Sequence, residues 1–135
     1  MVIPSLMMKI ERGDDPILVW GDGSSVRDFA YSADIADGTL LALQHGTRGS
    51  YVNLGSGKGY TIRELIDSLS EIVRFNYLFD STKSGGFPRR IMNINRARDW
   101  LGYEPKTDLK AGLDLTWNWF QENKDEYLRR YNYFK

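Results

Sequence analysis

Residues 20–29 read Trp20-Gly21-Asp22-Gly23-Ser24-Ser25-Val26-Arg27-Asp28-Phe29 and carry more information about the fold than any other stretch of this 135-residue chain. Just before the glycines, residues 17–20 form a short run of branched and aromatic side chains. Such a run is typical of a strand that enters a tight loop. Beyond the loop, residues 28–31 are predicted to form a second short strand.

Two side chains of this stretch point to a binding site. The indole of Trp20 offers a plane on which a base can stack, and the guanidinium of Arg27 can form a forked contact with a phosphate. The alternative is a β-turn with a buried Trp20, in which Arg27 stays in solvent or pairs with Asp22 or Asp28. The spacing alone leaves both interpretations open.

Helical patterns surround this stretch. Thr61 and Glu64 have the spacing of a capping box, and apolar residues recur at three to four positions after them. Ser32 and Thr107 are predicted N-caps, and Gly46 is a predicted helix stop. The predicted helices cover 4–12, 32–44, 61–72, 96–101 and 107–123, further strands cover 50–54 and 75–79, and a loop covers 80–90. This alternation predicts an α/β fold class, or α+β for an isolated fragment.

The composition excludes several classes of function. Eighteen basic and eighteen acidic residues give zero net charge, so the chain has no overall electrostatic footprint for nucleic acid or an anionic membrane. The sequence has no cysteine and one histidine, which argues against disulfides and metal sites. The apolar start reaches Lys9, Glu11 and Arg12 too early for a signal or membrane-spanning segment, which indicates a cytoplasmic chain without a membrane partner.

Two further segments could contact an anion. Gly55-Ser56-Gly57-Lys58-Gly59 looks like a phosphate loop, but it lacks the spacing of a dinucleotide fingerprint or a Walker loop, and a plain turn is the alternative. Lys83, Arg89 and Arg90 bracket a loop with two glycines and a proline. These three cations could clamp a diphosphate or form a solvated basic loop.

Taken in order, seven short blocks resemble the C-terminal half of extended short-chain dehydrogenases/reductases, the NAD-dependent epimerase/dehydratase family. The likeness is strongest to the GDP-L-fucose synthases, which are 3,5-epimerase/4-reductases, and it covers roughly residues 2–123. The order of the blocks is more specific than any one of them. The blocks are Val2-Ile3-Pro4, Val19-Trp20-Gly21-Asp22-Gly23-Ser24, Arg27-Asp28-Phe29, Asp34-Ile35-Ala36-Asp37, Val52-Asn53-Leu54-Gly55-Ser56-Gly57, Thr61-Ile62-Arg63-Glu64-Leu65 and Leu101-Gly102-Tyr103-Glu104-Pro105.

The resemblance implies a parent protein with an N-terminal Rossmann domain, which carries a Gly-rich NAD(P) turn and a catalytic Tyr-x-x-x-Lys pair. This sequence contains no Gly-x-x-Gly-x-x-Gly, and its only Tyr-x-x-x-Lys spacing, Tyr131 to Lys135, comes after the substrate-binding blocks. The Rossmann half is therefore expected to be missing, and no catalytic residue is assigned. NAD or NADP is expected to bind the parent enzyme and not this chain.

The same resemblance implies a nucleotide-sugar site, with Arg27 on the diphosphate. Residues 80–90 resemble the family's substrate loop, Asp-x-Thr-Lys-x-Asp-Gly-x-Pro-Arg-Lys. The implied substrate-binding residues are Lys9, Trp20, Arg27, Lys83, Arg89 and Arg90. Two positions depart from the family: Gly85 replaces the acidic residue of the loop, and Met1 stands where a catalytic histidine precedes Val-Ile-Pro.

The chain is accordingly interpreted as a sugar-nucleotide-binding domain at 1–123 followed by a tail at 124–135. The expected partners are a nucleotide-diphosphate sugar and the missing Rossmann half, and no nucleic acid. Self-association is also expected, because the helix at 32–44 and the strand at 51–54 would lose the cover of that half. A free-standing, non-catalytic binding or interaction module is the alternative function, and the identity of the base and sugar stays open.

Overall fold

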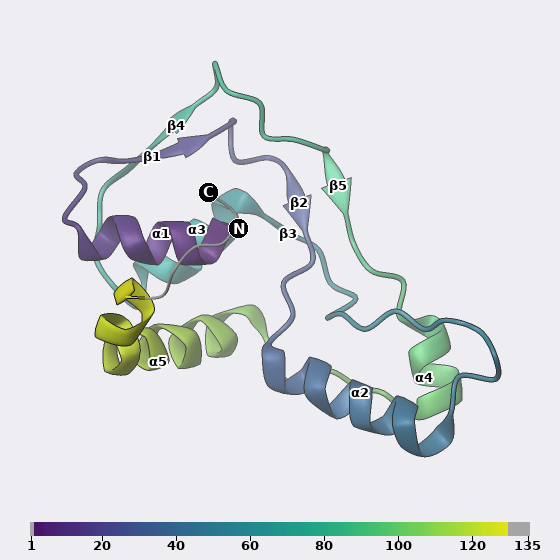
Figure 1. The fold of residues 1–135 in the computed structure, drawn as a ribbon. Coiled ribbons are helices and arrows are strands. Elements are labelled where there is room, and N and C mark those ends of the chain that lie inside the picture. Colours follow the sequence, from purple (N-terminus) through teal and green to yellow (C-terminus); the bar gives the residue numbers. More distant parts are fainter. Residues whose placement is uncertain (1, 130–135) are drawn as a thin grey trace.

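A computed structural model describes residues 2–129 as helices and short strands (Figure 1). The helices are α1 (Val2–Glu11), α2 (Ser32–His45), α3 (Ile62–Ser70), α4 (Asn95–Leu101) and α5 (Leu109–Arg129). The strands are β1 (Ile17–Trp20), β2 (Val26–Arg27), β3 (Tyr60–Thr61), β4 (Tyr77–Asp80) and β5 (Arg89–Arg90). This mixed arrangement confirms the predicted α/β class. No helix in the described part is long and apolar enough to cross a membrane.

The strands form two small sheets. β1 pairs with β4 in parallel, with Ile17 opposite Tyr77 and Trp20 opposite Asp80. β2 is the centre of the second sheet, where it is antiparallel to β3 and parallel to β5. Figure 1 shows the first sheet above α1 and α3, and the second sheet between these helices and the pair α2 and α4. The second sheet therefore connects two groups of helices.

The larger hydrophobic core lies between β1 and the helices α1, α3 and α5. Leu65, Ile66 and Leu69 of α3 are fully buried, as the apolar period after Thr61 predicted. Leu109 and Leu113 of α5, which recur at helical spacing, are also buried in this core. The periodicity of these two helices therefore predicted their buried faces correctly.

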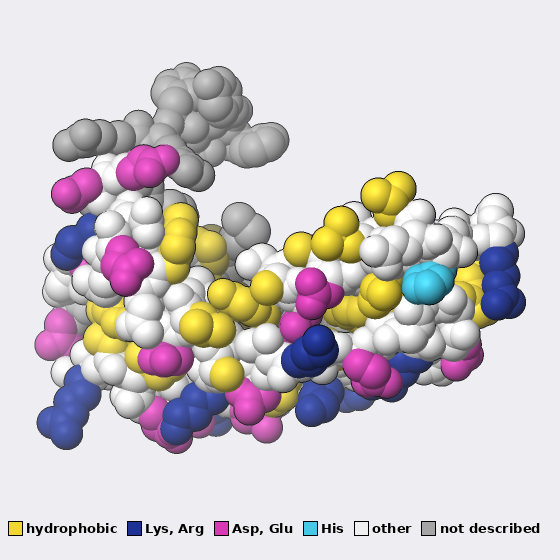
Figure 2. All heavy atoms as spheres, turned by 90° about the horizontal axis from the view of Figure 1, so that it is seen from below, with side chains coloured by type: hydrophobic (Ala, Val, Ile, Leu, Met, Phe, Trp, Pro, Cys, Tyr) yellow, Lys and Arg dark blue, Asp and Glu magenta, His cyan; other side chains and the backbone are white. Residues whose placement is uncertain are grey.

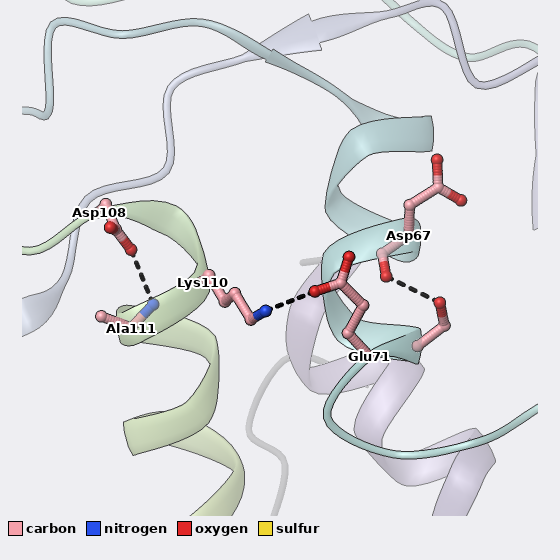
Figure 3. A network of polar contacts seen from close by, with 6 residues as sticks. Asp67, Glu71, Asp108, Lys110 and Ala111 are labelled. Atoms are coloured by element: carbon pink, nitrogen blue, oxygen red, sulfur yellow. Dashed lines mark hydrogen bonds and ion pairs between the residues drawn. The ribbon is translucent and has the colours of Figure 1, made fainter.

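Among the side chains that the structure describes, two ion pairs join α5 to its neighbours. Lys110 at the start of α5 pairs with Glu71, which follows α3 (Figure 3), and Lys124 lies 2.8 Å from Glu11 of α1. The hydrogen bond to the carboxylate raises the pKa of the lysine in each pair. Both pairs are partly exposed, so they orient α5 more than they stabilise it.

A smaller core lies between α2 and α4. Its buried members are Ile94, Ala97, Leu101 and Tyr103. The Tyr103 hydroxyl donates a hydrogen bond to the carbonyl of Gly55 at 3.0 Å, and burial raises the pKa of this phenol. Gly38 lets α2 approach closely, because a Cβ at this position would lie 2.8 Å from side-chain atoms of Leu54 and Tyr103.

Several predicted strands differ from the observed ones. Residues 50–54 belong to no strand, because no described strand lies alongside to form a ladder with them. The strand predicted at 28–31 is also wrong: β2 ends one residue earlier, where the Asp28 side chain bonds to another segment. β4 begins two residues later than the predicted 75–79, and β5 lies inside the loop predicted at 80–90.

The helix caps also differ in part. Tyr31 rather than Ser32 is the N-cap of α2, and no side chain caps this helix. At α5 the capping side chain is Asp108 instead of Thr107, since its Oδ1 accepts a hydrogen bond from the N–H of Ala111 at 2.8 Å (Figure 3). Thr107 and Asp108 are adjacent polar residues, and sequence spacing alone does not decide which of the two caps the helix.

The helix α5 continues past residue 123, although the residues beyond this position show no clear helical pattern. It extends to Arg129, so helix covers the first part of the predicted tail at 124–135. Residues 130–135, with the Tyr131 to Lys135 spacing, lie outside the described residues, as does Met1. The division of the chain at residue 123 stays a prediction.

The predicted capping box is present at the start of α3. Thr61 Oγ1 accepts a hydrogen bond from the Glu64 N–H at 3.0 Å, and Glu64 Oε2 accepts one from the Thr61 N–H at 2.7 Å. The N–H of Thr61, and then its hydroxyl, lower the pKa of Glu64. This contribution to stability is fully present above the ordinary pKa of a glutamate and is lost as the pH falls through the lowered value.

Replacing Thr61 with alanine is expected to lower the free energy of unfolding by about 1 kcal/mol at neutral pH, because the Glu64 N–H loses its acceptor and the Glu64 carboxylate loses the Thr61 hydroxyl as a donor. The effect should shrink as the pH falls from about 5 to about 3, where Glu64 becomes protonated. Urea unfolding followed by circular dichroism measures both changes. Thr39→Ala, at an exposed position within α2, is the control; equal losses in both variants would contradict the prediction.

Candidate functional site

A cleft of about 1010 Å³ lies between α1, β1, β2 and the segment between residues 84 and 90, elements that can be followed in Figure 1. The surfaces of α1 and β1 give it an apolar lining. Its cations are Lys9, Arg27 and Arg90, and the carboxylate of its lining is Asp28, which is engaged by backbone groups. An apolar cleft with a few convergent cations suits an anionic ligand that also carries an apolar or aromatic part.

Arg27 and Arg90 lie side by side in the second sheet. They are register partners in the parallel pair β2 and β5, so their side chains leave the sheet on the same face. Arg27 Nη1 donates a hydrogen bond to the carbonyl of Val26 at 2.8 Å, and Nη2 donates one to the carbonyl of Gly85 at 3.1 Å. These bonds hold the Arg27 guanidinium in place and leave three of its five N–H donors for a ligand.

The structure excludes the alternative interpretation of this stretch, a turn with a buried tryptophan. Trp20 is 66% exposed at the end of β1, where it lines the cleft. Asp22 accepts hydrogen bonds from the hydroxyl of Ser24 at 2.6 Å and from its N–H at 2.9 Å, which lower the pKa of Asp22. Within residues 2–129, neither Asp22 nor Asp28 forms a salt bridge with Arg27.

The other predicted site residues divide into two groups. Lys9 reaches the cleft from α1, and its Nζ donates a hydrogen bond to the carbonyl of Leu18 at 2.7 Å. Lys83 lies in the exposed turn after β4, and Arg89 precedes Arg90 on β5, so its side chain leaves the opposite face of the sheet. The predicted site residues that the cleft brings together are Lys9, Trp20, Arg27 and Arg90.

Asp28 fixes the wall of the cleft, a role that the sequence did not reveal. Its Oδ1 accepts hydrogen bonds from the N–H of Ser56 at 2.9 Å and from the Ser56 hydroxyl at 2.6 Å. Its Oδ2 accepts bonds from the N–H of Gly57 at 3.0 Å and of Met92 at 3.1 Å. The donors of the glycine loop therefore serve an internal carboxylate, which fits a plain turn and not a phosphate loop.

Comparison with known proteins shows which family has a similar sequence. A model of the NAD dependent epimerase/dehydratase family matches residues 1–55. GDP-L-fucose synthase 1 of Arabidopsis thaliana is 36% identical over 128 residues, which cover 90% of this chain and 39% of that protein. The chain belongs to the NAD-dependent epimerase/dehydratase family.

Solved structures of the family share the fold. UDP-glucose 4-epimerase from Thermotoga maritima, solved with UDP-glucose, has a TM-score of 0.81 and 30% identity over 92% of this chain and 40% of its own. UDP-glucuronic acid 4-epimerase from Bacillus cereus, in complex with UDP-glucuronic acid and NAD, has a TM-score of 0.79 and 25% identity over 90% of this chain and 40% of its own. The chain spans about two fifths of the length of these relatives and corresponds to the C-terminal part of an extended short-chain dehydrogenase/reductase.

Gly85 stands where the family resemblance places an acidic residue, and the packing explains why no side chain is present. A Cβ at Gly85 would lie 2.9 Å from Ser25 Oγ, and a Cβ at Gly21 would lie 3.0 Å from Gly85 Cα. The Gly85 carbonyl accepts hydrogen bonds from the Ser25 hydroxyl at 3.2 Å and from Arg27. The glycine therefore lets the loop before β5 lie directly against the loop between β1 and β2.

Replacing Asp28 with alanine is expected to lower the free energy of unfolding by about 3 kcal/mol, because Ser56, Gly57 and Met92 lose their common acceptor. Urea unfolding measures the loss. The matched control is Asp99→Ala, which removes an exposed aspartate from α4 and should change stability very little. Unfolding midpoints that coincide in the two variants would rule out the role given to Asp28.

Proposed function

We propose that this chain forms the nucleotide-sugar-binding part of a cytoplasmic, NAD(P)-dependent sugar-nucleotide epimerase or reductase of the GDP-L-fucose synthase type, and that it is not catalytic alone. The observation that carries the proposal is the register pairing of Arg27 with Arg90 beside an apolar cleft. Two adjacent guanidiniums match the charge of a diphosphate and can each form forked contacts with its oxygens. The UDP-sugars in the two solved relatives support this assignment.

The other groups of the cleft complement the two arginines. Lys9 adds a third cation, and Trp20 presents an exposed indole on which the base of the nucleotide can stack. The apolar surfaces of α1 and β1 displace water, which strengthens charge-assisted contacts. Because the Gly85 carbonyl already holds Arg27, less side-chain freedom is lost when the ligand binds.

The cofactor is assigned to the remaining part of the longer parent protein. The relative from Bacillus cereus holds NAD, but the residues of this chain do not fit a dinucleotide. Its sequence contains no Gly-x-x-Gly-x-x-Gly, and the donors of the glycine loop at 55–59 are used by Asp28. The chain's own contribution is to bind and orient the nucleotide sugar.

Titration of the purified chain with GDP, UDP, CDP and dTDP, followed by tryptophan fluorescence, tests the cleft. One nucleotide is expected to quench the emission saturably, because Trp20 lies at the rim. Arg27→Ala and Arg90→Ala should each weaken that binding roughly tenfold, since each removes a charge-assisted contact. Arg12→Ala, an exposed arginine outside the cleft, should leave the affinity unchanged. The same affinity in all three variants would refute the diphosphate assignment.

The partner proposed for this chain is the half that the family resemblance places before it. Leu40 and Leu43 of α2 are 57% and 82% exposed, and the nearby Tyr51 is 67% exposed. Figure 2 shows hydrophobic side chains at the surface over α2. Residues 51–54 also lie outside both sheets. A covering domain would bury these leucines and supply a neighbour for that segment.

Without this cover, the chain is expected to self-associate at micromolar concentration, which light scattering measures as a mass above that of one 15.6 kDa chain. Leu43→Glu should shift the distribution towards the monomer, because it places a charge in the exposed apolar face. Leu115→Glu, at an exposed leucine of α5, is the control and should have no such effect. A monodisperse wild-type monomer would contradict the proposal.

A further inference from the structure

Two arginines and an indole form a cluster at the end of the molecule away from the cleft. The guanidinium carbons of Arg48, which follows α2, and Arg96, on α4, each lie 5.4 Å from the ring centroid of Trp100. Arg96 also lies 4.7 Å from the ring centroid of Tyr51. Figure 2 shows Lys and Arg side chains at this end of the molecule, beyond α2. None of these four residues lines the cleft.

No carboxylate neutralises the two cations in the described part of the chain. Both arginines are exposed, and neither forms a salt bridge with a described residue, whereas Arg98 on the same helix pairs with Glu104 at 3.5 Å. Arg96 makes only long contacts, 3.4 Å to the Ser50 hydroxyl and 3.5 Å to the carbonyl of Tyr51. Most of the N–H donors of this arginine pair therefore stay available to an acceptor.

The backbone at Arg48 adopts a conformation that disfavours a side chain. Its φ of 55° lies in the left-handed region, between Gly46 at 72° and Gly49 at 69°. A glycine would occupy such a position more readily, but the residue here is an arginine, and its guanidinium lies over the ring of Trp100. Local strain that places a specific side chain is a feature of binding sites.

We propose that Arg48, Arg96 and Trp100 form a second anion site, which binds a phosphate group independently of the cleft. A phosphate dianion provides the two charges and the several acceptor oxygens that two guanidiniums can engage. Both arginines are long and exposed, so they can converge on one anion, and the Ser50 hydroxyl beside Arg96 adds a donor. The indole plane restricts the orientation of the two guanidiniums before the anion binds.

Proton–nitrogen correlation spectra of the chain, titrated with sodium phosphate, test the site through the indole N–H of Trp100. A saturable shift is expected with phosphate and not with sodium chloride at the same ionic strength. Methyl phosphate in a parallel titration distinguishes the source of the group: tighter binding of the ester indicates an organic phosphate, and tighter binding of the inorganic ion indicates the free anion. Identical responses to phosphate and chloride would overturn the proposal.

Arg48→Gly separates binding from structure. It should weaken phosphate binding roughly tenfold, because one cation is lost, without lowering the midpoint of urea unfolding, because glycine suits the left-handed backbone. Arg96→Gln should weaken binding to a similar degree. The control is Arg98→Gln, on the same helix, with unchanged phosphate affinity expected. Unchanged affinity in both Arg48→Gly and Arg96→Gln would refute the site, whatever their stability.

Discussion

The hydrogen bonds that the Asp28 carboxylate accepts hold the end of β2, the glycine loop and the segment after β5 together. Asp28 follows Arg27 directly, so the strand that presents the cleft guanidinium also holds the glycine loop and the segment after β5. The carbonyl of Gly55, at the start of that loop, accepts the hydroxyl of Tyr103 from the second core. A partly buried series of hydrogen bonds thereby connects the cleft to the core beside α4, and a satisfied polar network of this kind specifies a single arrangement.

The two cores differ in how completely they are covered. Helices on several sides enclose the core around β1, while α2 packs one face on α4 and leaves Leu40 and Leu43 in solvent. A helix with apolar residues on both faces is normally buried on both. In the proposed function, the cleft is one side of the nucleotide-sugar site, and the exposed face of α2 is one side of the interface with the remaining half of the parent protein.

The sequence predicted the features that depend on neighbours along the chain. The capping box of Thr61 and Glu64 and the strand at 17–20 follow from local spacing, and both are present. Other features depend on contacts between residues far apart in the sequence. No strand forms at 50–54 because no neighbour lies beside it, and Asp28 meets a loop 28 positions away. In the site, the register of β5 places Arg90 beside Arg27 and turns Arg89 to the opposite face of the sheet. No local pattern in the sequence fixes such a register.

The parallel pairing within both sheets has a consequence for how the chain reaches its native state. Ile17 pairs with Tyr77 and Val26 pairs with Arg89, so neither sheet is complete before the chain closes loops of about sixty residues. The long-range pairing raises the contact order, and folding is slower than in a helical bundle of equal length. During synthesis, β1 leaves the ribosome before β4. Until β4 follows, the apolar residues of β1 lack their pairing partner and can contact other chains.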